Sequence, residues 1–194
     1  MPQFKIEAAL RMYLPVETVS ETAGLDEQLR ERYSTKAFLE LEQGTVLGRF
    51  HDFWASLPQD DNGLPILTDD MLKAGLPGDV LHWVSRIDTR PENPMEYIMQ
   101  ACSTRQLPEY CVGAADTLVI EIPCIFHAIQ LAIECLACKH DRNAAYHVIN
   151  QTIGGKHSHY GRLLLPVGDA SGGVVEIFHV IRPVQVSHNV EAVG

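Results

Sequence analysis

The sequence has no long hydrophobic run and no cluster of basic residues. A membrane-spanning helix needs roughly 20 uncharged residues, and the first apolar stretch is already interrupted by Lys5, Glu7 and Arg11. Lys and Arg number 15 against 25 Asp and Glu, which gives a formal charge of -10, so we expect no binding to a row of phosphates. These absences argue against a membrane protein, a secretory signal peptide and a nucleic-acid partner. We therefore expect a cytoplasmic protein.

Cysteine is also scarce. The chain has five cysteines, an odd number, in 194 residues, and a chain of this length can bury a core without disulfide bonds. Reduced thiols fit this pattern better than a disulfide framework, which again favours the cytoplasm. The composition, 46% hydrophobic and 21% charged, is typical of a folded globular domain.

Two segments have the apolar periodicity of helices. From Thr45 to Leu57, apolar residues recur every three or four positions, and Pro58 then ends the pattern. A second helix is predicted from Pro123 to Cys138. Its main apolar stripe consists of Ile122, Ile125, Phe126, Ile129, Ile133 and Leu136. A second apolar arc contains Cys124, Leu131, Cys135 and Cys138, which leaves a narrow polar strip of His127, Gln130 and Glu134. We expect this helix to be buried on two sides.

Five segments are predicted to be strands: residues 80–87, 95–102, 144–153, 158–167 and 173–182. Short glycine-containing joints at 154–157 and 168–172 indicate an antiparallel meander of the last three strands. We divide the chain into a peripheral N-terminal helical extension (1–44), a main domain (45–183) and a C-terminal tail (184–194).

Several short strings resemble a subfamily of stand-alone bacterial PAS-like (Per-Arnt-Sim) proteins over roughly residues 46–183. They are Phe53-Trp54 with Leu57-Pro58, then Gly63-Leu64-Pro65, and above all Arg162-Leu163-Leu164-Leu165-Pro166-Val167 followed by the turn at 169–173. The order of predicted elements also resembles that of the PAS domain. The resemblance implies an α+β fold with a five-stranded antiparallel sheet, covering helices and an N-terminal helical extension. It further implies a sensor that acts in signal transduction.

A ligand pocket is predicted between the helix 123–138 and the sheet. His179 shares a strand face with Val175, Ile177 and Ile181, so it points toward the core. The predicted ligand-binding residues are His179 on the sheet, Phe126, Ile129 and Ile133 on the helix, and Tyr97 or Met99 from the second strand. The alternative is that His179 is a neutral core histidine hydrogen-bonded to backbone.

The sequence offers no assembled metal or haem site. Cys135 and Cys138 are followed by Lys139, not by the histidine of a haem attachment motif, and they lie near a helix C-terminus, where the dipole opposes a thiolate. His157 and His159 share a strand face but lack a third ligand. His127, placed like the helix histidine that ligates haem in some PAS sensors, lies about 150° from the apolar stripe. We expect buried structural cysteines, exposed His157 and His159, and no metal; the cofactor stays unknown.

No catalytic motif is present. Gly154-Gly155-Lys156 lacks the other glycines of a phosphate-binding loop, and Gly-x-Ser-x-Gly is absent. We therefore expect a non-enzymatic PAS-like sensory or protein-interaction module that binds a small ligand and passes its signal to a protein partner. The alternative is a haem- or metal-dependent sensor or small enzyme that uses histidine and cysteine ligands, drawn from His127, His157, His159, His179, Cys135 and Cys138.

The helix from Thr45 to Leu57 also suggests an oligomeric state. Phe50, Phe53 and Trp54 give it more large apolar groups than one edge of a PAS core needs, and surplus apolar surface favours a symmetric homodimer. The competing interpretation is that this helix folds back over its own sheet.

Overall fold

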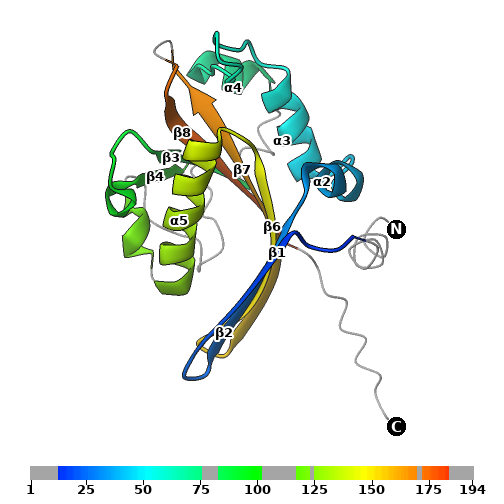
Figure 1. Cartoon of the computed structure of the whole chain (residues 1–194), viewed down its shortest axis with the longest axis vertical. Coiled ribbons are helices and arrows are strands. Elements are labelled where there is room, and N and C mark those ends of the chain that lie inside the picture. The colour runs from blue at the N-terminus through cyan, green and yellow to red at the C-terminus, as the bar shows by residue number, and fades with distance from the viewer. Residues whose placement is uncertain (1–12, 76–82, 102–116, 123–124, 170–171, 184–194) are drawn as a thin grey trace.

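The structure is a computed structural model that describes residues 13–75, 83–101, 117–122, 125–169 and 172–183. Within these residues the chain forms one antiparallel sheet of eight strands in the order β1-β2-β6-β7-β8-β3-β4-β5 (Figure 1). The strands are β1 (Glu17–Ala23), β2 (Asp26–Tyr33), β3 (Val84–Asp88), β4 (Ile98–Ala101), β5 (Thr117–Leu118), β6 (Ala145–Ile153), β7 (Lys156–Gly168) and β8 (Val174–Pro183).

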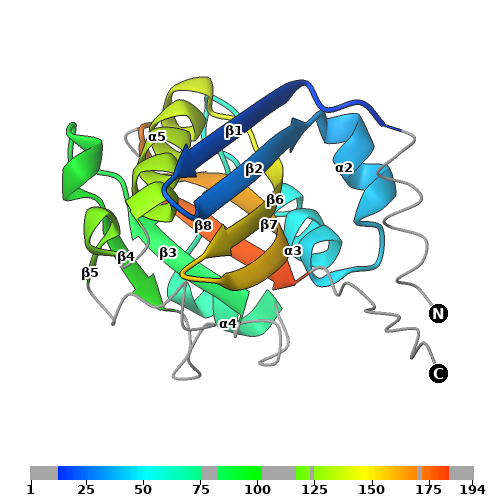
Figure 2. The ribbon, with the colours of Figure 1, turned by 90° about the horizontal axis from the view of Figure 1, so that it is seen from below.

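Helices cover both faces of this sheet. The long helix α5 (Ile125–Asp141) lies on one face, and α2 (Thr35–Leu41), α3 (Val46–Ala55) and α4 (Asp69–Gly75) lie on the other (Figures 1 and 2). Two short 3-10 helices, η2 (Pro94–Glu96) and η3 (Val119–Glu121), flank β4 and β5. The core is accordingly split into two hydrophobic clusters, one on each side of the sheet. Among the described residues, no helix has both the length and the apolar character needed to cross a membrane.

The predicted five-stranded PAS-like sheet with an N-terminal helical extension is wrong. The sheet has eight strands, and the N-terminal segment supplies two of them as the hairpin β1–β2, which pairs with β6. Leu25, Leu29 and Tyr33 have the four-residue spacing of a helix, which favours the predicted helical extension, but they do not form one buried face, because Leu25 is 95% exposed. The side chains of β2 alternate between the two faces of the sheet, and the polar residues Gln28, Arg30 and Arg32 occupy the face toward α5. A search for regularly spaced apolar residues therefore misses this strand.

The predicted elements of the main domain are largely observed. The five predicted strand segments correspond to β3, β4, β6, β7 and β8, and the two predicted helices to α3 and α5. Residues 80–82, Cys102, Pro123, Cys124 and the tail 184–194 lie outside the described residues.

Helix α3 packs on its own sheet. Leu47 and Phe50 are 0% and 1% exposed, and the indole Nε1 of Trp54 donates a hydrogen bond to the carbonyl oxygen of Pro166, 2.8 Å away. The apolar surface that suggested a homodimer is therefore largely used within the chain. The surplus-area argument for a dimer fails, and the oligomeric state remains a prediction that light scattering can check.

A buried carboxylate connects this helical layer to the sheet. Glu42, the residue that ends α2, is 0% exposed. Its two oxygens accept hydrogen bonds from Tyr146 (2.6 Å), Thr45 (2.7 Å) and the Arg182 guanidinium (2.7 and 3.1 Å). A Cβ on Gly48 would lie 2.1 Å from the Glu42 carbonyl oxygen, so glycine permits the close approach of α2 and α3.

Replacing Glu42 with Ala should destabilise the fold strongly. The Arg182 guanidinium and the Tyr146 hydroxyl would lose their buried acceptor, so we expect the free energy of unfolding to fall by about 3–5 kcal/mol. Urea denaturation at pH 7 measures the loss. Lys36→Ala in the same helix is the matched control, because Lys36 is exposed, and it should stay within about 0.5 kcal/mol of the parent protein. Equal stability of the two variants would contradict this account.

Candidate functional site

The polar strip of α5 faces the sheet. His127, Gln130 and Glu134 are 1%, 8% and 5% exposed, whereas Ile133 is 49% exposed. The helix is therefore oriented differently from the expectation that Ile129 and Ile133 would cover the sheet. Its polar groups turn inward because the sheet presents charged and polar partners to them.

The structure separates most of the predicted ligand-binding residues. His179 is fully buried, and Tyr97 and Met99, 0% and 3% exposed, lie in the apolar cluster beneath α5. Ile129 is half-buried, and the side chain of Phe126 lies outside the described residues. Of the predicted residues with described side chains, Ile133 alone lines the cavity defined below.

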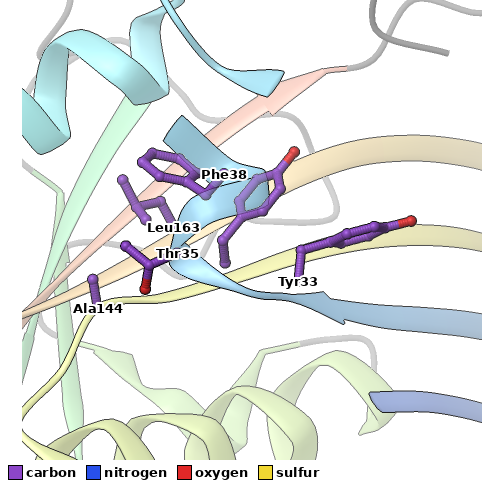
Figure 3. Close-up of a pocket in the computed structure, with 6 residues that line it drawn as sticks. Tyr33, Thr35, Phe38, Ala144 and Leu163 are labelled. Atoms are coloured by element: carbon purple, nitrogen blue, oxygen red, sulfur yellow. The ribbon is translucent and has the colours of Figure 1, made fainter. Parts of the chain in front are cut away.

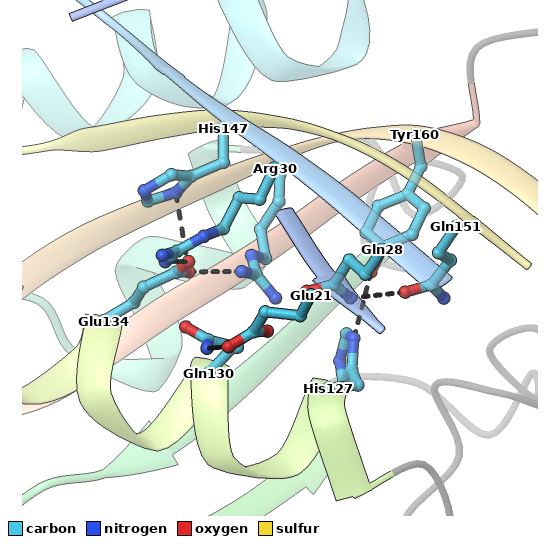
Figure 4. Close-up of polar contacts among 10 residues, drawn as sticks. Glu21, Gln28, Arg30, His127, Gln130, Glu134, His147, Gln151 and Tyr160 are labelled. Carbon is cyan, nitrogen blue, oxygen red and sulfur yellow. Dashed lines mark hydrogen bonds and ion pairs between the residues drawn. The ribbon is translucent and has the colours of Figure 1, made fainter. Parts of the chain in front are cut away.

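The central feature beneath α5 is a buried carboxylate held between two arginines. Glu134 accepts a hydrogen bond from Arg30 at Oε1 and from Arg162 at Oε2, and Nδ1 of His147 lies 3.5 Å from Oε2 (Figure 4). Arg162, His147 and Arg30 are 1%, 3% and 9% exposed. The four residues come from β2, β6, β7 and α5, so the cluster joins segments that are far apart in sequence.

Strand register explains how these side chains meet. Arg32 on β2 pairs with His147 on β6, and His147 pairs in turn with Arg162 on β7, which forms a row across three strands. Arg30 lies two residues from Arg32 and therefore on the same face. Glu17 on β1 is the cross-strand partner of Arg32. The hairpin β1–β2 thus carries charged groups to the face that α5 covers.

The cluster carries a net positive charge near pH 7. Burial opposes ionisation of Glu134, but Arg162, His147 and Arg30 together hold its pKa below the ordinary value. Burial lowers the pKa of His147 to about 4, against the opposing effect of Glu134. No further carboxylate among the described residues lies within ion-pair distance of Arg30 or Arg162. Two guanidinium groups therefore share one carboxylate beside a neutral imidazole.

A second buried polar group lies next to this cluster. Nδ1 of His127 is 3.0 Å from the hydroxyl of Tyr160, the rings of His127 and His179 are 6.2 Å apart, and Nδ1 of His179 is 2.9 Å from Oγ of Ser85. Burial, followed by the charge of Arg162, lowers the pKa of His127 to about 3 and that of His179 well below its ordinary value. Ser85 and His179 are 1% and 0% exposed. Their hydrogen bond joins β3 to β8 in the core and leaves the hydroxyl no open side for a substrate.

A cavity of about 130 Å³ lies beside the charged cluster, between the hairpin β1–β2 and the C-terminal half of α5. Its walls are formed by Glu17, Arg30, Arg32, Ile133, Glu134, Ala137, Cys138, Asp141, Asn143, Ala145 and His147. A cavity of about 150 Å³ in another protein holds benzene, so this one suits a ligand of about five or six non-hydrogen atoms.

A second cavity, on the opposite face of the sheet, is too small for an organic ligand. It is lined by Tyr33, Thr35, Phe38, Ala144, Tyr146 and Leu163 and has a volume of about 10 Å³ (Figure 3). This is about the space that one water molecule requires. The cavity beneath α5 is therefore the better candidate site.

The residues considered for metal binding do not form a set of ligands, although the rings of His127 and His179 are neighbours. Within the described part of the chain, no group of three or more His, Cys, Asp and Glu side chains is arranged to hold a metal ion. His157 is exposed and its Nε2 lies 2.7 Å from Oδ1 of Asn150, while His159 is half-buried.

The two thiols near the end of α5 are buried. Cys135 and Cys138 are 0% and 2% exposed, and Sγ of Cys138 donates to the Asn143 carbonyl, 3.2 Å away. Burial raises the pKa of Cys135 well above its ordinary value and that of Cys138 to about 12. Both thiols therefore stay protonated, as structural cysteines do.

Sequence reasoning misses the part of the site that β1 and β2 contribute. Glu17, Arg30 and Arg32 lie in a segment whose sequence predicts a peripheral helical extension. The alternation of Gln28, Arg30 and Arg32 with Leu29, Glu31 and Tyr33 is the signal that points to a strand. This alternation becomes informative when it is considered together with the polar strip of α5. The polar side chains of β2 and of α5 can form hydrogen bonds and ion pairs with one another when both are buried.

Comparisons with known proteins identify no relative: no family model, no curated protein and no solved structure matches this chain. The resemblance to PAS-like proteins therefore receives no support from them.

The buried histidines should make stability depend on pH. The folded-state pKa values of His127, His147 and His179 lie below the unfolded value of about 6.5. The unfolded chain therefore takes up protons first as the pH falls, and stability is lost below pH 6.5. We expect up to about 2 kcal/mol of loss for each buried histidine between pH 6.5 and 5.

Urea denaturation at a series of pH values measures this effect. Glu134, whose pKa is held below its ordinary value mainly by Arg162, stays ionised over that range and contributes little to the slope. His147→Gln should make the dependence shallower, and the control His157→Gln should leave it unchanged because His157 is exposed. A free energy of unfolding that is equal at pH 7 and pH 5 would contradict the assignment.

The thiols of α5 should matter for packing alone. Replacing Cys135 and Cys138 with Ala should cost roughly 1–3 kcal/mol each, because both fill core positions. Thermal and urea denaturation measure the cost under reducing and oxidising conditions. A double variant that keeps its melting temperature and loses a redox response would show that the thiols have a chemical role.

Proposed function

We propose that this protein is a non-enzymatic sensory module that binds a small carboxylate in the cavity between the hairpin β1–β2 and α5. The observation that carries the proposal is the buried pair of guanidinium groups on Arg30 and Arg162, which share the single carboxylate of Glu134 at the wall of that cavity. A buried charge is costly unless it is paired. A bound monoanion would supply the missing negative charge.

The donors that face the cavity suit a carboxylate. A guanidinium carries five N–H donors in a planar fork. Arg30 donates to Glu134 through NH1, and its other nitrogen atoms make no hydrogen bond with a described residue. His147 also lines the cavity with its ring, while its buried Nδ1 is directed to Oε2 of Glu134, 3.5 Å away. A ligand carboxylate can therefore accept from the remaining N–H donors of Arg30 and lie beside the His147 ring.

The geometry favours binding over catalysis. The groups that line the cavity are arginines, carboxylates and a histidine with a lowered pKa, and the thiol of Cys138 is held protonated by burial. None of these described groups is an activated nucleophile with an adjacent base. A ligand in this cavity would contact β2, β6 and α5 together, and it would stabilise the docked hairpin by mass action. We infer that a protein partner reads this change.

A cytoplasmic location is part of the same proposal, and the protonated, buried thiols of Cys135 and Cys138 support it. We also propose that the protein acts without a bound cofactor. Freshly purified protein should then be colourless and free of stoichiometric metal, which absorption spectra and elemental analysis test. A Soret band or a bound metal would favour the haem- or metal-dependent alternative.

Arg30 should be required for carboxylate binding. Titration calorimetry with propionate should show saturable binding to the parent protein, and Arg30→Gln should weaken it by at least about tenfold, because a charge-assisted hydrogen bond is lost. Because Arg30 is buried, Arg30→Gln could also impair folding, so Arg32→Gln serves as a second variant. The Arg32 side chain is 38% exposed, so this variant should fold, and it should also weaken propionate binding. Arg49→Gln is the control, since Arg49 is exposed on α3 on the opposite face. Absence of binding to the parent protein by every small carboxylate tested would overturn the proposal.

A further inference from the structure

The charges of the cavity are arranged in two zones. The inner zone consists of Arg30 and Glu134, which line the cavity, and of Arg162, which does not line it but is paired with Glu134. The three residues are buried and carry a net charge of one positive unit. The outer zone contains Arg32, Glu17 and Asp141, where one guanidinium faces two carboxylates. The cavity is therefore positive at its buried end and negative at its mouth.

The contacts at the mouth leave its carboxylates available. NH2 of Arg32 lies 4.0 Å from Oδ2 of Asp141, and the two side chains are 38% and 56% exposed, so this ion pair is long and solvated. Glu17 is exposed and faces Arg32 across the β1–β2 ladder. No ion pair of Glu17 exists among the described residues. Neither carboxylate is consumed by a tight partner.

The end of α5 adds to the negative potential at the mouth. Asp141 is the last residue of this 17-residue helix, and the C-terminus of a helix carries a partial negative charge that favours cations. Lys139, which could offset that charge, is directed away and donates to the carbonyl oxygens of Thr89 (2.5 Å) and Pro91 (3.1 Å). The mouth is thus suited to a cationic group.

From this arrangement we propose that the ligand is a small zwitterion, an amino acid of about the size of glycine or alanine, with its carboxylate at Arg30 and His147 and its ammonium group between Glu17 and Asp141. This inference rests on the proposed carboxylate-binding function and specifies its substrate class. The volume of about 130 Å³ accommodates a molecule of this size. It excludes amino acids with long side chains unless the side chain remains in solvent.

Glycine and propionate provide the test, because they are nearly isosteric and differ in that an ammonium group replaces a methyl group. Calorimetric titration of the parent protein with glycine, propionate and ethylamine should give the tightest binding for glycine, by at least about tenfold over propionate. Ethylamine, which lacks the carboxylate, should bind most weakly. Titrations at low and moderate salt should show that the advantage of glycine falls as the exposed carboxylates are screened.

The double variant Glu17→Gln with Asp141→Asn isolates the ammonium contact. Both residues are exposed, so the variant should fold like the parent protein. It should bind glycine and propionate about equally, while its affinity for propionate stays at or above the parent value. Asp61→Asn, an exposed substitution in the connector between α3 and α4, is the matched control and should keep the preference for glycine.

The outcomes separate this inference from the function on which it rests. Equal binding of glycine and propionate to the parent protein would overturn the zwitterion and leave the carboxylate site in place. Binding of ethylamine but not propionate would overturn the proposed orientation of the ligand together with the carboxylate function. A glycine preference that survives in the double variant would show that Glu17 and Asp141 do not hold the ammonium group.

Discussion

The ion pairs of Glu134 with Arg30 and Arg162 determine how the two halves of this structure fit together. The carboxylate belongs to α5, one guanidinium to the N-terminal hairpin and the other to the centre of the sheet. All three groups are nine-tenths buried or more, so both guanidinium groups depend on the Glu134 carboxylate for compensation of their charge, and the carboxylate depends on them. Removal of Glu134 would leave two uncompensated guanidinium groups in the interior, whereas removal of one arginine would leave a one-to-one ion pair. The position of α5 over β2 and β7 is therefore fixed by electrostatics as well as by apolar packing.

This constraint accounts for the difference between the two faces of the sheet. The face under α2 and α3 is packed with apolar and aromatic side chains, such as Phe38, Phe50 and Phe178. The face under α5 has an apolar cluster near β3, β4 and the middle of the helix, and a polar region toward β2 and β6. The polar region forms a small charged cavity, whereas the cavity between Tyr33 and Leu163 on the apolar face has room for about one water molecule. A ligand site is thus expected where charge prevents complete packing.

The sequence predicts the elements that follow simple periodicity and misses those that do not. Helix α3 and the strands from β6 to β8 have apolar residues at regular spacing, so the amino-acid pattern alone locates them. Strand β2 places Gln28, Arg30 and Arg32 on its buried face, and a pattern search assigns such residues to solvent. The orientation of α5 is missed for the same reason. His127, Gln130 and Glu134 look like a solvent-facing strip until their partners on β1, β2 and β7 are known, and the Arg30 partner of Glu134 is more than 100 residues away in the sequence.

The same arrangement links ligand binding to the stability of the hairpin β1–β2. This hairpin joins the sheet through a single neighbour, β6, and through charged contacts with α5, including the hydrogen bond of Gln130 to Glu21 at 2.6 Å. Docking of the hairpin buries Arg30, and the unpaired positive charge in the cavity makes this step less favourable. A bound carboxylate offsets that cost, so it favours the docked position of the hairpin over positions in which Arg30 is solvated. A ligand that also reaches Glu17 from its ammonium group adds a contact to β1 itself, and in this way occupancy of a small site would set the position of two strands at the edge of the sheet.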